Sequence, residues 1–124
     1  MMNPFLQVAL GGSLGAVARY AVTRAAGRVF GHGFPVGTLA VNILGSFLMG
    51  LLVVLLAHRG NAWAPLLMTG VLGGFTTFSA FSLDTMTLWM RGSQGIAAAY
   101  VAASVGLSLA GMAAGLAVGR GIAA

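Results

Sequence analysis

The residue types best able to do chemistry are concentrated in residues 70–81, which read GVLGGFTTFSAF. The adjacent Gly73 and Gly74 are followed by the β-branched Thr76 and Thr77, and this combination weakens an α-helix. If the segment lies in a membrane, carbonyl groups freed there are tolerated only where they are buried in protein or line a cavity. Broken helices commonly bind ions through such groups. We therefore predict a helix break here, with an intact helix of small packing residues as the alternative.

Polar side chains recur at helical spacing in two other stretches. One stretch carries Thr38, Asn42, Gly45 and Met49 on one face, and the other carries Tyr100, Ser104 and Ser108. Residues three or four apart lie side by side on a helix. Hydrogen bonding between helices, worth about 0.6 kcal/mol on average, explains any single one of these residues. Two aligned stripes and a helix break together predict a narrow polar track.

The chemistry of this track favours a small anion that accepts hydrogen bonds. Its walls offer hydroxyl and amide groups that can donate hydrogen bonds, and one of these groups is the hydroxyl of Ser79. Its walls also include the aromatic rings of Phe78 and Phe81, which are three residues apart in the sequence. The edges of such rings are electropositive, although apolar packing is the simpler explanation for them. A cation would prefer carboxylates or rings of carbonyl groups. The sole carboxylate side chain, Asp84, lies toward the end of its span.

The composition makes the lipid bilayer the solvent for the elements that position these residues. Of the 124 residues, 59% are hydrophobic, a further 20 are glycine and only 6% are charged. A membrane-spanning helix needs about 20 mostly apolar residues. We predict an all-α, multi-pass membrane protein with a single four-helix domain over residues 1–124. The predicted spans are residues 6–26, 36–57, 63–90 and 95–118, and the predicted break lies in the third.

The charges indicate an unusual membrane orientation. Six arginines and one acidic residue give a net charge of +5. The arginines lie mainly at span ends, where they meet lipid headgroups, so we expect no nucleic-acid partner. Arg24, Arg28 and Arg91 lie on one side, and Arg59, Arg120 and the terminal amine lie on the other. Because Lys and Arg asymmetry sets orientation, this balance predicts dual topology.

Arg19 is predicted to lie well inside the first span, where a charge is costly unless it is paired or reaches the interface. It either satisfies backbone carbonyl groups or lies at a vestibule where anions gather. The sequence has no Cys, His, Asp or Glu residues at the spacing of metal ligands, and no nucleophile paired with a general base. Asp84 is its one carboxylate side chain, so a pair of catalytic carboxylates is excluded. We therefore predict that the chain is not an enzyme.

Small residues recur at the spacing with which membrane helices pack. They are Gly11 and Gly15, Ser46 and Gly50, Gly70 and Gly74, and Gly111, Gly115 and Gly119. Such residues let two helix backbones approach closely. Four short helices enclose little space by themselves, so we expect a compact bundle that oligomerises.

Three sequence blocks resemble the Fluc (CrcB-type) family of bacterial fluoride channels. They are GGSLGAVARY at 11–20, GTLAVNILG at 37–45 and GVLGGFTTFSAF at 70–81. The resemblance implies passive export of fluoride from the cytoplasm across the bacterial inner membrane, which relieves fluoride toxicity. It also implies an antiparallel, dual-topology homodimer with two pores and a structural sodium ion between the subunits.

The resemblance also assigns roles to individual residues. The fluoride pore would use Asn42, Phe78, Phe81, Tyr100 and Ser104, with Thr38, Ser79 and Ser108 as weaker assignments. The carbonyl groups of Gly73 and Thr76 would bind sodium, and Arg19 is expected to be structural. One alternative is a small multidrug-type transporter, which would require a membrane-embedded Glu that the sequence lacks. The other is a structural membrane subunit without transport, which leaves Asn42 and the two phenylalanines unexplained.

Overall fold

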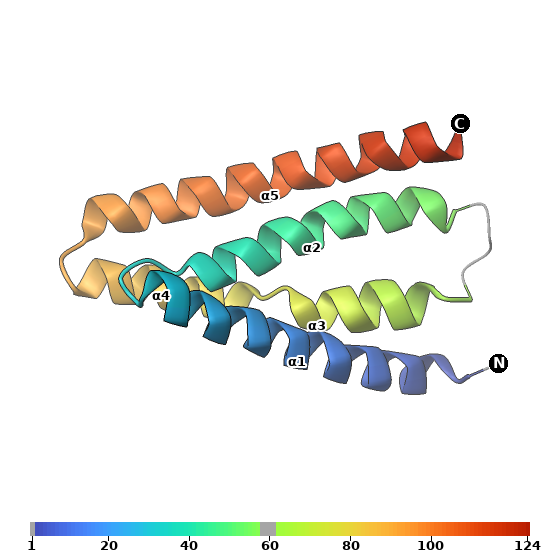
Figure 1. The fold of residues 1–124 in the computed structure, drawn as a ribbon, viewed down its shortest axis with the longest axis horizontal. Coiled ribbons are helices and arrows are strands. Elements are labelled where there is room, and N and C mark those ends of the chain that lie inside the picture. The colour runs from blue at the N-terminus through green and yellow to red at the C-terminus, as the bar shows by residue number, and fades with distance from the viewer. Residues whose placement is uncertain (1, 58–61) are drawn as a thin grey trace.

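The protein is a bundle of four long helical spans, seen in a computed structural model that describes residues 2–57 and 62–124 (Figure 1). Four helices are long and apolar enough to cross a membrane, which confirms the predicted all-α class: Pro4–Phe30, Val36–Leu55, Pro65–Met90 and Gln94–Ala123. Successive spans run in opposite directions, so the two chain ends lie at the same end of the bundle. Residues 58–61, which include Arg59, and Met1, which carries the terminal amine, lie outside the described residues.

The ends of the first two spans follow from local backbone chemistry. Helix α1 (Pro4–Phe30) begins after Asn3, whose side chain accepts a hydrogen bond from the Phe5 amide, and it ends at Gly31, which has a φ of 76°. Helix α2 (Val36–Leu55) begins directly after Pro35. Helix α1 continues beyond the predicted span, residues 6–26, because Arg28 has a high helix propensity and the helix ends only at Gly31.

The third span consists of several pieces. A π-helical turn, η1 (Pro65–Leu72), leads into the short α3 (Gly73–Phe75), and α4 (Phe78–Met90) completes the span. Between α3 and α4, Thr76 has φ −86° and ψ 157°, and Thr77 has φ −153° and ψ 126°. Both residues are therefore extended, and we refer to them as the extended pair. The last span, α5 (Gln94–Ala123), follows a turn at Gly92, which has a φ of 86°.

Glycines bring the spans into direct backbone contact, as the small-residue spacing predicts. A Cβ atom added at Gly15 on α1 would overlap the carbonyl oxygen of Val71 on η1. A Cβ atom at Gly115 on α5 would overlap the carbonyl oxygen of Phe47 on α2. The bundle is thus two closely packed helix pairs, α1 with the first half of the third span and α2 with α5.

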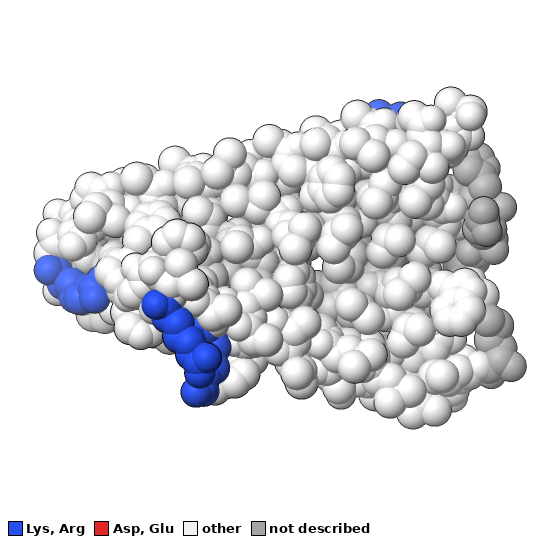
Figure 2. Space-filling view, in the orientation of Figure 1, with Lys and Arg blue, Asp and Glu red and all other residues white. Residues whose placement is uncertain are grey.

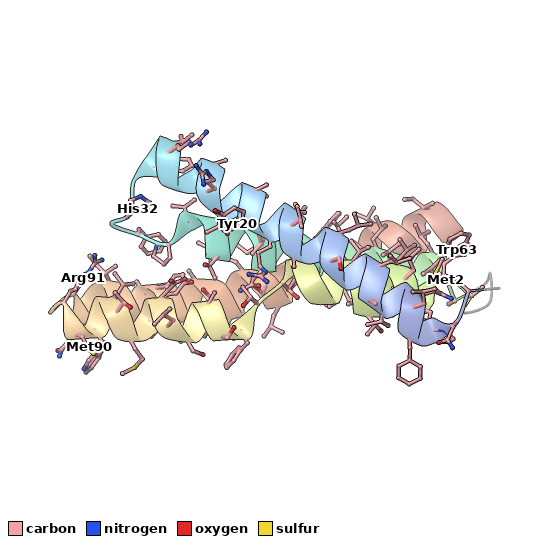
Figure 3. The ribbon with its side chains drawn as sticks, turned by 90° about the horizontal axis from the view of Figure 1, so that it is seen from below. Met2, Tyr20, His32, Trp63, Met90 and Arg91 are labelled. Carbon is pink, nitrogen blue, oxygen red and sulfur yellow. The ribbon has the colours of Figure 1, made fainter. Side chains whose placement is uncertain are left out.

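Charged and aromatic side chains occur at both ends of the bundle, whereas Arg19 lies between the ends, beside Gly74. His32, Met90 and Arg91 lie at one end, and Met2 and Trp63 lie at the other (Figure 3). Arginine side chains are visible at both ends of one face, and the surface between them is uncharged (Figure 2). An uncharged surface bounded by such ends is typical of a membrane-spanning bundle.

Candidate functional site

A groove of about 500 Å³ lies between α2, the third span and α5. Five residues predicted for the pore line it: Asn42, Phe78, Phe81, Ser104 and Ser108. Gly73 and Thr76, predicted as cation ligands, line it too. The groove thus brings together residues from three of the four spans.

Asn42 is bound to the extended pair by two hydrogen bonds. Its Nδ2 donates to the carbonyl oxygen of Thr77 at 3.0 Å, and its Oδ1 accepts from the amide nitrogen of Thr77 at 2.8 Å. One side-chain amide therefore satisfies both backbone polar groups of Thr77. A polar side chain within a membrane-spanning helix needs such partners.

Two further side chains hold the backbone around the extended pair. The hydroxyl of Thr77 accepts a hydrogen bond from the Ala80 amide at 3.2 Å, which caps the start of α4. Arg19 Nε donates to the carbonyl oxygen of Gly74 at 3.0 Å, so its side chain lies against α3. Of the two roles considered for Arg19, this contact corresponds to satisfying a backbone carbonyl.

The predicted phenylalanines form the start of an aromatic row. The ring centroids of Phe78 and Phe81 are 5.4 Å apart, and those of Phe81 and Tyr100 are also 5.4 Å apart. A third pair joins Tyr100 to Phe34, at 5.5 Å with the rings nearly perpendicular. Phe81 therefore packs between two rings, whereas the Phe78 side chain is 77% exposed.

Three of the predicted pore residues do not line this groove. Tyr100 is fully buried, and its hydroxyl donates to Asp84 Oδ2 at 3.1 Å. Thr38 is also buried and, with Asp84 and His32, lines a second pocket of about 260 Å³. Ser79 is exposed, and its hydroxyl lies 3.3 Å from that of Thr77. Tyr100 is thus in contact with Phe81 on one side and with the carboxylate of the second pocket on the other.

The groove also has walls that the sequence analysis did not assign to the pore, namely Ser46, Val105 and Met112. Ser46 follows Asn42 by four residues and Met112 follows Ser108 by four, so the i+4 spacing of the predicted stripes would have identified these two residues, although not Val105. The hydroxyl oxygen of Ser104 is buried and has no hydrogen-bond partner among the described residues. A buried polar atom of this kind normally has a partner, so Ser104 offers an available hydroxyl beside the groove.

The backbone beside the groove can supply cation ligands where side chains cannot. Within residues 2–57 and 62–124 there is no group of three or more His, Cys, Asp or Glu side chains that could hold a metal ion. In a continuous α-helix, the carbonyl groups of Gly73 and Thr76 would accept from the amides of Thr77 and Ala80. Those two amides donate instead to Asn42 and to the Thr77 hydroxyl. Both carbonyl groups are therefore released from helical pairing, which fits a carbonyl-bound cation.

The four membrane-length helices make this chain a multi-pass membrane protein. A polar groove lies between its second, third and fourth spans, which is typical of membrane proteins that conduct solutes. The model of the CrcB-like protein family, Camphor Resistance (CrcB), matches residues 6–116, and the chain belongs to this family. The family resemblance seen in the sequence is thereby confirmed.

Relatives with assigned functions match almost the whole chain. A fluoride-specific ion channel FluC of Cereibacter sphaeroides is 66% identical over 121 residues, covering 98% of both chains. A protein of the same name from Paracoccus denitrificans is 63% identical, and the match covers 98% of this chain and 98% of the relative. Another from Caulobacter vibrioides is 53% identical, and the match covers 96% of this chain and 97% of the relative. These relatives are ion channels rather than enzymes, in agreement with the absence of enzymatic function predicted from the sequence.

Proposed function

We propose that this chain is a fluoride-specific channel that lets fluoride leave the bacterial cytoplasm passively across the inner membrane. The observation that carries the proposal is the 66% identity, over nearly the full length, to a protein named as such a channel. The same relatives favour a channel over a multidrug-type transporter or a structural subunit. Hydrogen fluoride crosses membranes as a neutral weak acid and dissociates in the cytoplasm. A passive anion pathway therefore relieves fluoride toxicity without coupling to an energy source.

The groove is the proposed fluoride pathway. Ser104 and Ser108, which carry hydroxyl donors, line the same space of about 500 Å³ as Phe78 and Phe81, whose ring edges are electropositive. Tyr100, Thr38 and Ser79 extend the pathway toward the second pocket in this proposal. A small anion that accepts strong hydrogen bonds suits such a lining better than a large, weakly hydrated anion.

We propose that the extended pair acts as a helix break at mid-membrane and that a structural sodium ion binds there. The carbonyl groups of Gly73 and Thr76 would hold the ion. Such groups replace the hydration shell of a monovalent cation without any anionic side chain. Bound there, the ion would compensate carbonyl dipoles that are otherwise costly in a membrane interior.

The functional unit in this proposal is an antiparallel, dual-topology homodimer with two pores, each chain contributing one four-helix domain. In such a dimer the two-fold axis lies in the membrane plane, so only midplane residues meet their own copies. The exposed Gly73 and the 77% exposed Phe78 lie next to the extended pair and are available to a second copy. A cation shared between two copies would therefore lie at the paired breaks.

Purified protein in liposomes tests the proposed function. Liposomes loaded with fluoride should release it when an ionophore removes the opposing voltage, and liposomes loaded with chloride should not. Protein-free liposomes are the control for hydrogen fluoride leakage. Equal release of the two anions would refute a fluoride-specific channel.

A further inference from the structure

Asn42 makes two hydrogen bonds to the backbone of Thr77, one donated by Nδ2 and one accepted by Oδ1. We propose that Asn42 is a positioning residue that keeps the Gly73 carbonyl available for the cation and thereby couples the fluoride groove to the cation site. This inference rests on the proposed function. It assigns to Asn42 a role beyond that of a pore wall.

The geometry of Thr77 explains why an asparagine is required. In an extended residue the N–H and C=O groups point to the same side, as they do in an antiparallel strand pair. The carboxamide of Asn42 offers one acceptor and two donors, so it pairs with both groups at 2.8 Å and 3.0 Å. It thus takes the place of a neighbouring strand inside a helical bundle. Leucine has neither group, and an ionised aspartate has no donor.

The pairing has a direct consequence for the cation site. If Asn42 released the Thr77 amide, that N–H could turn toward the carbonyl oxygen of Gly73, four residues earlier, and extend α3. One proposed cation ligand would then be lost. The hydroxyl of Thr77, which caps α4 through Ala80, would move with its backbone. Phe78 and Phe81 would therefore change position together with the cation ligands.

The same pairing limits what Asn42 offers to an anion. One Nδ2 hydrogen is donated to Thr77, so a single N–H remains for the groove that Asn42 lines. The two amide hydrogens of this side chain are therefore in different environments. They should differ in hydrogen exchange and in their response to fluoride.

Hydrogen exchange measured by NMR on the isotope-labelled, full-length protein in lipid nanodiscs tests the inference. In Asn42→Leu the Thr77 amide loses its side-chain acceptor, so it should either exchange about tenfold faster or, where it pairs with the Gly73 carbonyl oxygen instead, give helical Cα chemical shifts at residues 76–77. Asn42→Asp keeps an acceptor and lacks the donor, so in that variant the Thr77 carbonyl group, not the amide, should lose its partner. The sodium concentration that half-maximally stabilises the oligomer should rise several-fold in both variants. Leu44→Ala, on the exposed side of the same helix, is the matched control and should change neither quantity. Unchanged Thr77 exchange together with unchanged Cα chemical shifts at residues 76–77 in Asn42→Leu would overturn the inference.

A measurement on the wild-type protein needs no variant to fold. One Nδ2 hydrogen of Asn42 should exchange slowly, and the other should exchange faster and shift when fluoride is added. Equal exchange of the two hydrogens would also overturn the inference. Because exchange rates require no transport, a failure here is distinguishable from a failure of the liposome assay.

Discussion

Replacing Phe78 or Phe81, which line the groove, by isoleucine separates an anion-binding role of the rings from a packing role. Isoleucine keeps apolar bulk but has no electropositive ring edge. The structure predicts different stability costs for the two variants. Phe78 takes part in one aromatic pair and is 77% exposed, whereas Phe81 takes part in two pairs and is partly buried.

The magnitudes follow from these pairs. At about 0.5–1.5 kcal/mol for each aromatic pair, Phe78→Ile should lower stability by that amount and Phe81→Ile by about twice as much. If the ring edges face the permeating anion, fluoride efflux should fall about tenfold or more in both variants, which corresponds to about 1.4 kcal/mol in the barrier. The flux loss should therefore not follow the order of the stability losses.

A fluoride electrode measures efflux from liposomes, and thermal unfolding in detergent measures the stability of the same preparations. Phe5→Ile is the matched control, because Phe5 is 88% exposed on α1 and lies outside the groove. Normal efflux through Phe78→Ile, or flux losses proportional to stability losses, would refute the role of the ring edges. The phenylalanines would then be packing residues.

Three further predictions concern packing, orientation and the cation. Gly115→Ala should destabilise the bundle by about 1–3 kcal/mol in thermal unfolding, because its Cβ would overlap the Phe47 carbonyl oxygen. Gly106→Ala should not, because no atom of the described residues lies within 4 Å of a Cβ at that position. Two or three lysines added at one end should fix a single orientation and abolish efflux until an oppositely biased copy is co-expressed; full activity of a single forced orientation would contradict dual topology. Replacing sodium with potassium in all buffers should weaken the oligomer in native gels and reduce fluoride efflux, and unchanged oligomer and efflux would remove the sodium assignment.

The fold class was predictable because few solutions satisfy this composition. A chain that is 59% hydrophobic and 6% charged cannot cover a water-facing surface. In lipid every backbone group must be paired internally, which leaves helices for segments of this length. The span ends were less predictable, since α1 and α5 continue as helices to Phe30 and Ala123. Hydropathy marks where lipid ends, not where helical hydrogen bonding ends.

The types of residue in the site were predictable, but their partners were not. Helical spacing places Thr38 and Asn42 on one face of their helix, and it places Tyr100 and Ser104 on one face of another. The spacing does not say how each helix is rotated about its axis relative to its neighbours. That rotation directs the Tyr100 hydroxyl to Asp84 and leaves the Ser104 hydroxyl without a hydrogen-bond partner in the part of the chain that the structure describes. It also directs Thr38 into the second pocket rather than the groove.

The extended pair shows why composition alone could not decide between an intact and an interrupted helix. Glycines and threonines lower helix propensity by less than about 1 kcal/mol each, which tertiary contacts routinely override. Unpaired backbone groups in a membrane cost several kcal/mol each, which favours an intact helix. Asn42, 35 residues earlier, changes this balance because it satisfies both groups of Thr77. The conformation of residues 76–77 therefore depends on a residue on another helix, and a variant that lacks this carboxamide should shift the third span toward continuous helix.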